Sequence, residues 1–443
     1  MPENRRDTGL VRVLTSWGLA ASIFNTVVGA GIYAVPAALA DSVGVYAPLI
    51  FLVCAVAIGS VAICFAEGGS RIATSGGAYG YIEASFGPLA GCVGGTLLWF
   101  GNVLSSGAIA AALADGAAGL FPEAARAAAH VLVIVAAIGG IAWVNIGGPA
   151  RGARLAEGMA VLKLLPLAVF LAAGAGAIRA STFWETGAPT PAGFGRGVIL
   201  ALFAFTGMEI PLSASGEVAR PGKTIPRALM LATLPIVLLY ILIQIIAQGI
   251  LGAALARSAA PLADAMGAVH PALRVLMLAG AAVSMAGFLS SDILGTPRML
   301  FAFGRDGLLP RVVGRVHPRT HAPHVAILSY AAVACALAMS GTFAELAVLA
   351  TLASAALYIL SCAAAWRLAR GGVAQAGAPL NFPWIGSAAV IGTGSMLLLI
   401  ALASRAEIAG LVGVIAVSAL VDLGRRHFRK PALAEARSSQ KQR

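Results

Sequence analysis

Three ionisable side chains interrupt long apolar stretches of this 443-residue sequence, namely Lys163, Glu209 and Asp292. An ionisable group inside a membrane span is costly to bury, so it marks a functional site by default. A lysine in such a place could take up and release protons. An aspartate there could pair with a cationic group of a ligand, or with the lysine or another polar group inside the protein.

Glycine interrupts two of the apolar stretches, at residues 28–32 (VGAGI) and 203–209 (FAFTGME), and Pro36 and Pro211 follow these segments. Unwinding a helix in a membrane frees N–H and C=O groups, which a ligand or a water-filled cavity must satisfy. A helix N-terminus offers N–H donors to a carboxylate, and a helix C-terminus offers carbonyls to an ammonium group. An α-amino acid carries both charges. The alternative is that these glycines only let the helices pack closely.

The composition indicates a membrane protein. Hydrophobic residues make up 59% and charged residues 11% of the chain, and the mean hydropathy is +0.89. Soluble domains contain roughly 25% charged residues, so an ordinary soluble enzyme is excluded, and disorder is excluded by the high hydrophobicity. A span takes about 20 residues, and twelve apolar runs are present, at 16–38, 43–66, 88–114, 127–146, 155–178, 194–216, 229–253, 271–296, 323–340, 345–366, 384–403 and 407–424.

The basic residues predict the orientation of the chain. The net charge is +12, but no basic helix face with interleaved aromatic residues suggests nucleic-acid binding. If the N-terminus is cytoplasmic, 23 of the 30 Lys and Arg residues fall in cytoplasmic segments and six in outer segments, with Lys163 inside a span. Cytoplasmic loops are rich in Lys and Arg, so we expect an inner membrane protein with both termini in the cytoplasm.

The run pattern predicts one transporter domain. Residues 1–13 would form a cytoplasmic N-terminus, 14–424 the membrane domain, and 425–443 a basic cytoplasmic tail that is disordered or lies at the lipid surface. The first run resembles a signal peptide, but it is longer than the usual apolar core of about 7–15 residues, so we interpret it as a span. The five cysteines lie in apolar runs without a CxxC pair and predict neither a disulfide nor a metal site.

The two interruptions fall in the first and the sixth run, five spans apart. This is the register of an inverted repeat of five plus five helices, and broken helices at equivalent positions point to a transporter binding site. We therefore expect an all-α, multi-pass protein with repeat one at about 14–178, repeat two at about 194–368 and two extra helices at about 384–424. No HExxH or GxSxG motif suggests an enzyme, and no cofactor is expected.

The sequence resembles bacterial amino acid permeases of the amino acid–polyamine–organocation superfamily. The resemblance runs from about residue 14 to about residue 422 and rests on motifs that occur in the same order. These motifs are GAGIY at 29–33, SGGAYGY at 75–81 with FGP at 86–88, FTGME at 205–209, GEVARP at 216–221 with TIPRA at 224–228, and RMLFAFGRDGLLP at 298–310.

The resemblance implies a substrate site between spans 1, 3, 6 and 8. N–H groups around Gly29, Ala30 and Gly31 would face the substrate carboxylate, although alanine at position 30 lacks the hydroxyl of the serine that some members have there. Backbone carbonyls would receive the amino group, Phe203 would cap the ligand, and Asn102 would contact the substrate side chain. The carbonyls are those of Val27, Phe203, Ala204 and Thr206.

The resemblance also assigns roles to the buried charges. Lys163 would couple transport to protons, with its ammonium in place of the cation that sodium-coupled relatives hold between spans one and eight. The alternatives are that Lys163 snorkels to the interface, or that Ser290 and Ser291 bind sodium. Glu209 would move protons or accept hydrogen bonds from the broken helix, and Asp292 would lie near the substrate.

These observations together predict a proton-coupled amino acid permease that works by alternating access. An exchanger of amino acids or amines on the same fold is the main alternative, and a membrane enzyme or a passive channel is less compatible with two broken helices. We expect an amino acid or related amine, protons and the lipid bilayer as partners, and no nucleic acid. The sequence leaves the identity of the substrate and the oligomeric state open.

Overall fold

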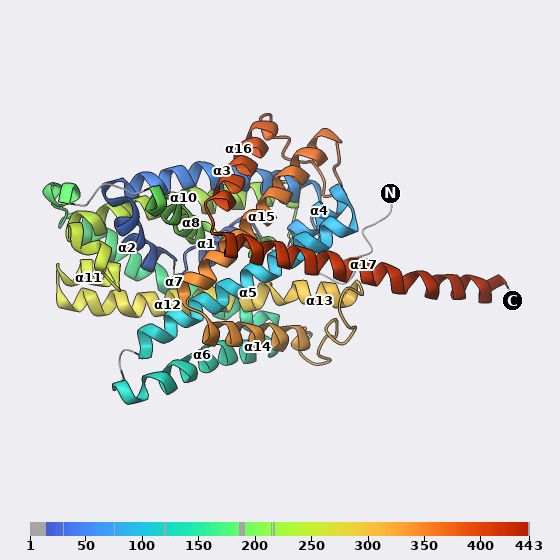
Figure 1. Cartoon of the computed structure of the whole chain (residues 1–443), viewed down its shortest axis with the longest axis horizontal. Coiled ribbons are helices and arrows are strands. Elements are labelled where there is room, and N and C mark those ends of the chain that lie inside the picture. The colour runs from blue at the N-terminus through green and yellow to red at the C-terminus, as the bar shows by residue number, and fades with distance from the viewer. Residues whose placement is uncertain are drawn as a thin grey trace.

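The computed structural model describes residues 15–29, 31–74, 76–118, 121–185, 191–213, 215 and 218–441, and the regular elements in these ranges are helices (Figure 1). The first part of the chain forms the helices α1 (Ser16–Val27), α2 (Gly31–Val43), η2 (Gly44–Tyr46), α3 (Ala47–Arg71), α4 (Ala78–Phe86), α5 (Pro88–Ala118), α6 (Glu123–Ile146), α7 (Pro149–Ala175) and η3 (Ala180–Glu185).

The second part of the chain continues in the same way. Its helices are α8 (Pro191–Phe205), α9 (Glu209–Leu212), α10 (Pro221–Leu251), η5 (Gly252–Arg257), α11 (Pro261–Gly267), α12 (Pro271–Gly295), α13 (Pro297–Arg305), α14 (His324–Ser340), α15 (Phe343–Arg370), α16 (Ile385–Ala401) and α17 (Arg405–Lys441).

Local sequence signals explain where many of these helices begin. Proline stands at the first position of α5, α7, α8, α10, α11, α12 and α13, where its missing N–H costs nothing and its fixed φ already suits the helix. The Thr15 side chain caps α1 by accepting from Gly18 N at 3.2 Å. Thr342 and Glu345 form a reciprocal capping box at the start of α15.

Two helix ends differ from the apolar runs of the sequence. Helix α10 begins at Pro221 rather than near residue 229, and α17 continues to Lys441 rather than ending near residue 424. The structure shows the predicted tail as helix as far as residue 441, and its place at the lipid surface stays a prediction. Hydropathy marks only the apolar part of a helix, whereas backbone hydrogen bonding continues into charged segments such as the first turns of α10.

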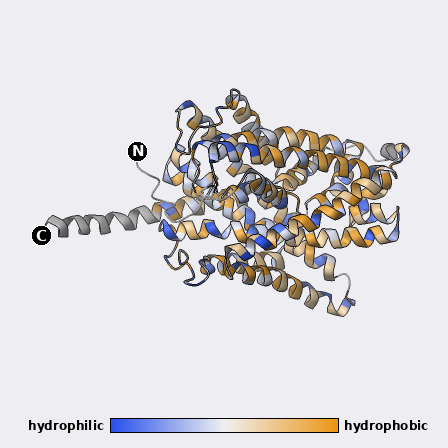
Figure 2. Cartoon of the chain, turned by 180° about the vertical axis from the view of Figure 1, so that it is seen from behind, coloured by the Kyte–Doolittle hydropathy of each residue, from blue (hydrophilic) through white to orange (hydrophobic). Residues whose placement is uncertain are grey.

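Among the residues that the structure describes, eight helical segments are long and apolar enough to cross a membrane. They are Gly31–Arg71, Pro88–Ala118, Glu123–Ile146, Ala150–Ala175, Pro221–Arg257, Pro271–Arg305, Phe343–Arg370 and Arg405–Leu423. Three shorter apolar helices, Gly193–Phe205, His324–Ser340 and Ile385–Ala401, accompany them. Figure 2 shows apolar residues along most of the bundle and hydrophilic residues gathered toward its ends. The fold is that of an all-helical, multi-pass membrane protein.

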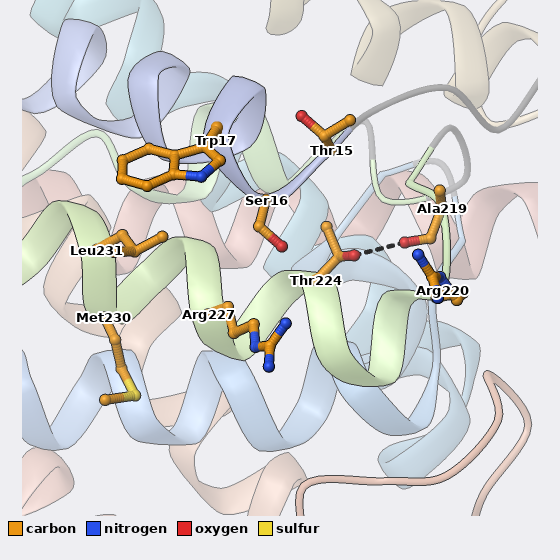
Figure 3. Close-up of a pocket in the computed structure, with 9 residues that line it drawn as sticks. All are labelled: Thr15, Ser16, Trp17, Ala219, Arg220, Thr224, Arg227, Met230 and Leu231. Atoms are coloured by element: carbon orange, nitrogen blue, oxygen red, sulfur yellow. Dashed lines mark hydrogen bonds between the residues drawn. The ribbon is translucent and has the colours of Figure 1, made fainter.

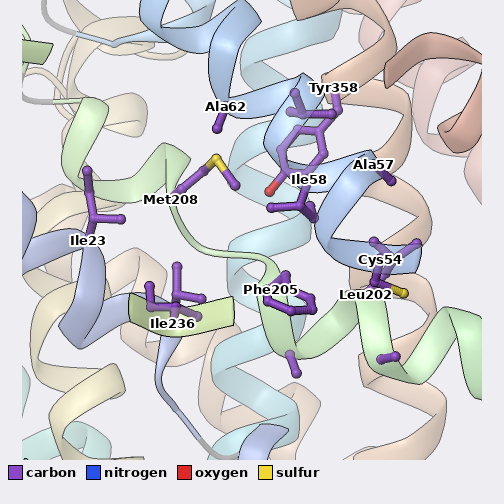
Figure 4. Packing of buried hydrophobic residues seen from close by; sticks show 14 of the residues in the cluster. Ile23, Cys54, Ala57, Ile58, Ala62, Leu202, Phe205, Met208, Ile236 and Tyr358 are labelled. Atoms are coloured by element: carbon purple, nitrogen blue, oxygen red, sulfur yellow. The ribbon is translucent and has the colours of Figure 1, made fainter. Parts of the chain in front are cut away.

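The helices pack in pairs that place the two interrupted helices inside the bundle. Helix α5 packs along α15, α7 along α12, and α3 along α10, while α1 contacts α7, α10 and α12. The largest apolar cluster surrounds the interruption between α8 and α9. Phe205 and Met208, on either side of it, lie among side chains of α3, α10 and α15 (Figure 4).

Candidate functional site

Both helix interruptions are present at the expected residues. Helix α1 ends at Val27 and α2 begins at Gly31, and Val28 and Gly29 lie between them in non-helical conformations. Ala30 lies outside the described residues. Helix α8 ends at Phe205 and the short α9 begins at Glu209, with Gly207 at a φ of 112°. The first N–H groups of α2 and the last carbonyls of α1 and α8 have no partner within their own helices.

The two interruptions touch each other, and glycine makes this contact possible. A Cβ atom on Gly31 would lie 2.8 Å from the Ala204 Cα, and one on Gly207 would lie 3.1 Å from the Thr26 carbonyl oxygen. Close packing is therefore one reason for these glycines, as the alternative interpretation of the sequence held. The same contact brings the freed backbone groups of both helices to one place.

Lys163 from α7 reaches the broken end of α1. Its side chain is fully buried, and its Nζ donates to the carbonyl oxygens of Asn25 at 2.8 Å and Val28 at 2.7 Å. Snorkelling to the membrane surface is thus not what this lysine does. A positive charge at the C-terminal end of a helix also interacts favourably with the helix dipole. The structure places the ammonium against the carbonyls that the interruption of α1 exposes.

Helix α12 completes the surroundings of this ammonium. Ser284 Oγ donates to the carbonyls of Val28 at 3.0 Å and Gly29 at 3.2 Å. Asn25 Nδ2 donates to Ser291 Oγ at 2.5 Å, and a Cβ atom on Gly287 would lie 3.3 Å from the Lys163 Nζ. The ammonium therefore lies between α1 and α12. The carbonyl and hydroxyl groups here are the type that would hold a small cation, but the lysine already supplies the positive charge.

Glu209 stabilises the second interruption. Its Oε2 accepts a hydrogen bond from Gly207 N at 3.1 Å and another from the Tyr358 hydroxyl of α15 at 2.7 Å. The carboxyl group is buried, so these donors replace water around it. This geometry gives Glu209 the role of an acceptor for the freed N–H of the broken helix.

Tyr240 of α10 connects both interruptions and was not singled out from the sequence. Its hydroxyl lies 2.8 Å from the Val27 carbonyl oxygen and 2.8 Å from the Ala204 carbonyl oxygen. These are two of the carbonyls expected to receive the substrate amino group. A carbonyl has two lone pairs. The Ala204 carbonyl can therefore accept a second donor, whereas the Val27 carbonyl also accepts from Gly29 N at 2.8 Å. A polar hydroxyl within the apolar run at 229–253 was the available signal.

Phe203 and Thr206 lie on the α8 side of the site. The Thr206 Oγ1 and N donate to the Phe203 carbonyl at 2.8 Å and 3.2 Å, which terminates the helix locally. The Phe203 ring is buried and packs edge to face on Phe343 of α15, with centroids 5.7 Å apart. This places Phe203 at the wall formed by α5, α8 and α15.

Asp292 and Asn102 belong to one buried polar network between α5, α12 and α14. Asp292 Oδ2 accepts from Ser106 Oγ at 2.5 Å and from the Tyr330 hydroxyl, and Oδ1 accepts from Thr296 Oγ1. Asn102 Nδ2 donates to the same Thr296 hydroxyl at 3.2 Å. Three hydroxyl groups thus surround the carboxylate, whereas the Lys163 ammonium meets backbone carbonyls of α1.

A cavity of about 590 Å³ leads to the first interruption. It runs between α1, α7, α9 and α12 from Trp17 and Arg298 to Asn25 and Ser291, the side chains beside Lys163. Residues of α1 and α12 that lie beside Lys163 therefore line this cavity.

Known proteins are similar to this chain over most of its length. A family profile described as "Amino acid permease" matches residues 14–419. The branched-chain amino acid permease BcaP of Bacillus subtilis is 26% identical over 387 residues, which cover 80% of each protein.

Two relatives from Mycobacterium tuberculosis are named as uncharacterized transporters. One is 33% identical over 328 residues, which cover 71% of this chain and 70% of the relative. The other is 28% identical over 328 residues, and the match spans 66% of this chain and 66% of the relative's length. These relatives are bacterial proteins, and their names point to transport rather than to enzymatic chemistry.

Proposed function

Because this chain belongs to the amino acid permease family and is a transporter rather than an enzyme, we propose that it takes up neutral amino acids by proton symport with alternating access. The observation that carries the proposal is the contact between the Lys163 ammonium and the α1 carbonyls of Asn25 and Val28. A buried proton-carrying group fixed directly to a broken helix can make the position of that helix depend on protonation.

The substrate site of this proposal lies where the two interruptions meet. The N–H groups at Ala30 and Gly31 bind the carboxylate, since the start of α2 leaves its first donors free. The Gly29 N–H, also predicted for this role, donates to the Val27 carbonyl at 2.8 Å. The amino group is received by backbone carbonyls of both interruptions, beside the Tyr240 hydroxyl. Of the predicted carbonyls, those of Val27 and Phe203 already accept two hydrogen bonds each, so those of Ala204 and Thr206 are the main acceptors. Phe203 closes the site from the α8 side.

The polar network favours a substrate without an extra positive charge. The carboxylate of Asp292 already accepts from three hydroxyl groups, so it has little capacity left for a cationic side chain. In this proposal Asp292 holds Thr296, and through it Asn102, at the edge of the site. The name of the Bacillus subtilis relative, a branched-chain amino acid permease, agrees with a neutral apolar substrate.

The transport cycle and topology form part of the proposal. We take the twelve apolar runs as twelve spans in the inner membrane with both termini cytoplasmic. Span three packs along span ten (α5 with α15), and span eight packs along span five (α7 with α12). A shift by five spans exchanges these pairs, which supports an inverted repeat of five plus five helices. The cavity to Asn25 then corresponds to the path toward the cytoplasm.

Uptake into proteoliposomes under an imposed pH gradient tests the proposal. We expect accumulation of a neutral amino acid that collapses when the gradient is dissipated and that does not require sodium. Saturation with substrate concentration separates a carrier from a channel. Counterflow without net accumulation would instead assign the protein as an exchanger, and dependence on a sodium gradient would contradict the role of Lys163.

A further inference from the structure

A second cavity, which shares Trp17 with the path to Lys163, lies between the first turn of α1 and the first turns of α10. Its volume is about 570 Å³. Figure 3 shows the start of α1 beside the N-terminal part of α10, with side chains of both helices around the cavity. The lining residues are Thr15, Ser16, Trp17, Ala219, Arg220, Thr224, Arg227, Met230 and Leu231.

One part of this cavity is strongly basic. Arg220 and Arg227 are both exposed, and no acidic residue is among the nine that line the cavity. In the part of the chain that the structure describes, neither guanidinium has an ion-pair or hydrogen-bond partner. The Thr224 hydroxyl donates to the Ala219 carbonyl at 2.6 Å, so the Thr224 oxygen is held in place at the same wall. Two unpaired guanidinium groups suit an oxyanion such as phosphate, which they can bind through paired N–H donors.

The other part of the cavity is apolar and faces outward. Trp17 and Met230 are each 74% exposed, and Leu231 is 40% exposed. Tryptophan is enriched where a membrane meets water, and exposed apolar residues on a spanning helix face lipid tails. A ligand that fits the whole cavity therefore has an anionic head and an apolar tail.

We propose that this cavity binds an anionic phospholipid, with its phosphate on Arg220 and Arg227 and an acyl chain along Trp17, Met230 and Leu231. Basic pockets between membrane helices recognise anionic head groups. Free phosphate offers the same charge, but it would leave the apolar part of the cavity unused. Charge complementarity and the adjoining apolar wall together select the lipid.

The position of the cavity gives the lipid a role in holding α1. One wall is the first turn of α1, and the other wall is α10, whose Tyr240 hydroxyl contacts the Val27 carbonyl at the far end of α1. A lipid in the cavity and Tyr240 would fasten opposite ends of the same half-helix to α10. Occupancy therefore stabilises the arrangement of α1 described here.

The test compares lipid binding by the purified full-length protein and its variants, using native mass spectrometry and thermal unfolding. The probes are phosphatidylglycerol and phosphatidylcholine with identical acyl chains. We expect the wild type to bind phosphatidylglycerol more tightly and to unfold at a higher temperature with it. The double variant Arg220→Gln/Arg227→Gln should bind phosphatidylglycerol about tenfold more weakly, because each basic residue contributes to the attraction.

Lys223→Gln is the matched control, since Lys223 is exposed on the same first turns of α10 but does not line the cavity. It should retain the preference for phosphatidylglycerol. An equal loss in Lys223→Gln would assign the effect to diffuse surface charge and overturn the proposal. The single variants Arg220→Gln and Arg227→Gln provide the same comparison if the double variant does not fold.

Inorganic phosphate and Met230→Ser test the apolar part of the site. Phosphate alone should neither displace phosphatidylglycerol nor raise the unfolding temperature at millimolar concentration, and Met230→Ser should weaken lipid binding. If phosphate protected the protein as well as the lipid does, or if the double variant kept its preference for phosphatidylglycerol, the lipid site would be refuted.

Discussion

The two helix interruptions are stabilised in opposite ways. At the end of α1, exposed carbonyls accept hydrogen bonds from Lys163, a residue 138 positions away along the chain. Between α8 and α9, an exposed N–H donates to Glu209, which is only two positions away. The first interruption needs a donor and takes it from a separate helix, while the second needs an acceptor and supplies it locally.

This difference suggests different roles for the two interruptions. Protonation of Lys163 can control the first, whereas the second is held by a residue of its own turn. The Lys163 contact joins α7 to α1. A change in the charge of the Lys163 side chain on α7 would therefore act on the position of α1. The hydrogen bond from Gly207 N to Glu209 lies within one turn and can move with that turn, while the Tyr358 hydroxyl connects the same carboxyl to α15. We therefore propose that coupling depends on the first interruption and local shape on the second, and five variants at four positions test this proposal.

The largest effect is expected from Lys163→Ala. The variant leaves two buried carbonyls without their charged donor, and we expect at least a tenfold loss of pH-gradient-driven accumulation in proteoliposomes. A loss of about 2–3 kcal/mol in stability should accompany it, as for other buried groups left unpaired. Lys223→Ala, at an exposed position of α10, should transport normally. Unchanged accumulation by Lys163→Ala would show that coupling lies elsewhere.

Gly31→Ala should come next, because it forces the two interruptions apart. The added Cβ would lie 2.8 Å from the Ala204 Cα, and overpacking of this kind costs about 1–3 kcal/mol. We expect a lower unfolding temperature and a raised KM for uptake. Gly139→Ala in α6 has nothing within 4 Å of the new Cβ and should be neutral or slightly stabilising. Equal behaviour of the two variants would argue against close contact between the interruptions.

Two variants at Glu209 sharpen the contrast between coupling and shape. Glu209→Ala removes the acceptor for Gly207 N and the Tyr358 hydroxyl and should cost about 1–3 kcal/mol of stability. Glu209→Gln keeps an acceptor oxygen, so we expect near-normal unfolding and retained pH-driven uptake. A stable Glu209→Gln protein without coupled uptake would instead give this carboxyl a role in proton movement.

The smallest effect is expected from Tyr240→Phe. The variant removes the hydroxyl shared by the Val27 and Ala204 carbonyls while keeping the ring, so we expect a loss of about 1 kcal/mol in stability or substrate affinity. Thermal unfolding and KM measure the two possibilities. Tyr46→Phe, at a position 52% exposed, serves as the control. If both variants match the wild type, Tyr240 does not link the interruptions.

Much of the fold could be predicted from the sequence, because a membrane imposes strong local rules. Apolar run length, the proline and glycine positions and the excess of basic residues in alternate loops each act within a few turns of chain. The interruptions between Val27 and Gly31 and between Phe205 and Glu209 follow from the same local chemistry, since glycine there favours unwinding. Helix ends such as Pro221 and Lys441 were placed less well, because hydropathy does not mark where backbone hydrogen bonding stops.

The partners of the buried polar groups were decided only by the tertiary structure. Local sequence marks Lys163, Asp292 and Tyr240 as unusual, but it does not say which helix each will face. In the structure, Lys163 contacts the α1 carbonyls, and three hydroxyl groups surround Asp292. The Tyr240 hydroxyl contacts a carbonyl of each interruption. A hydrogen bond depends on distances of a few tenths of an ångström, and only the packing of distant helices sets such distances.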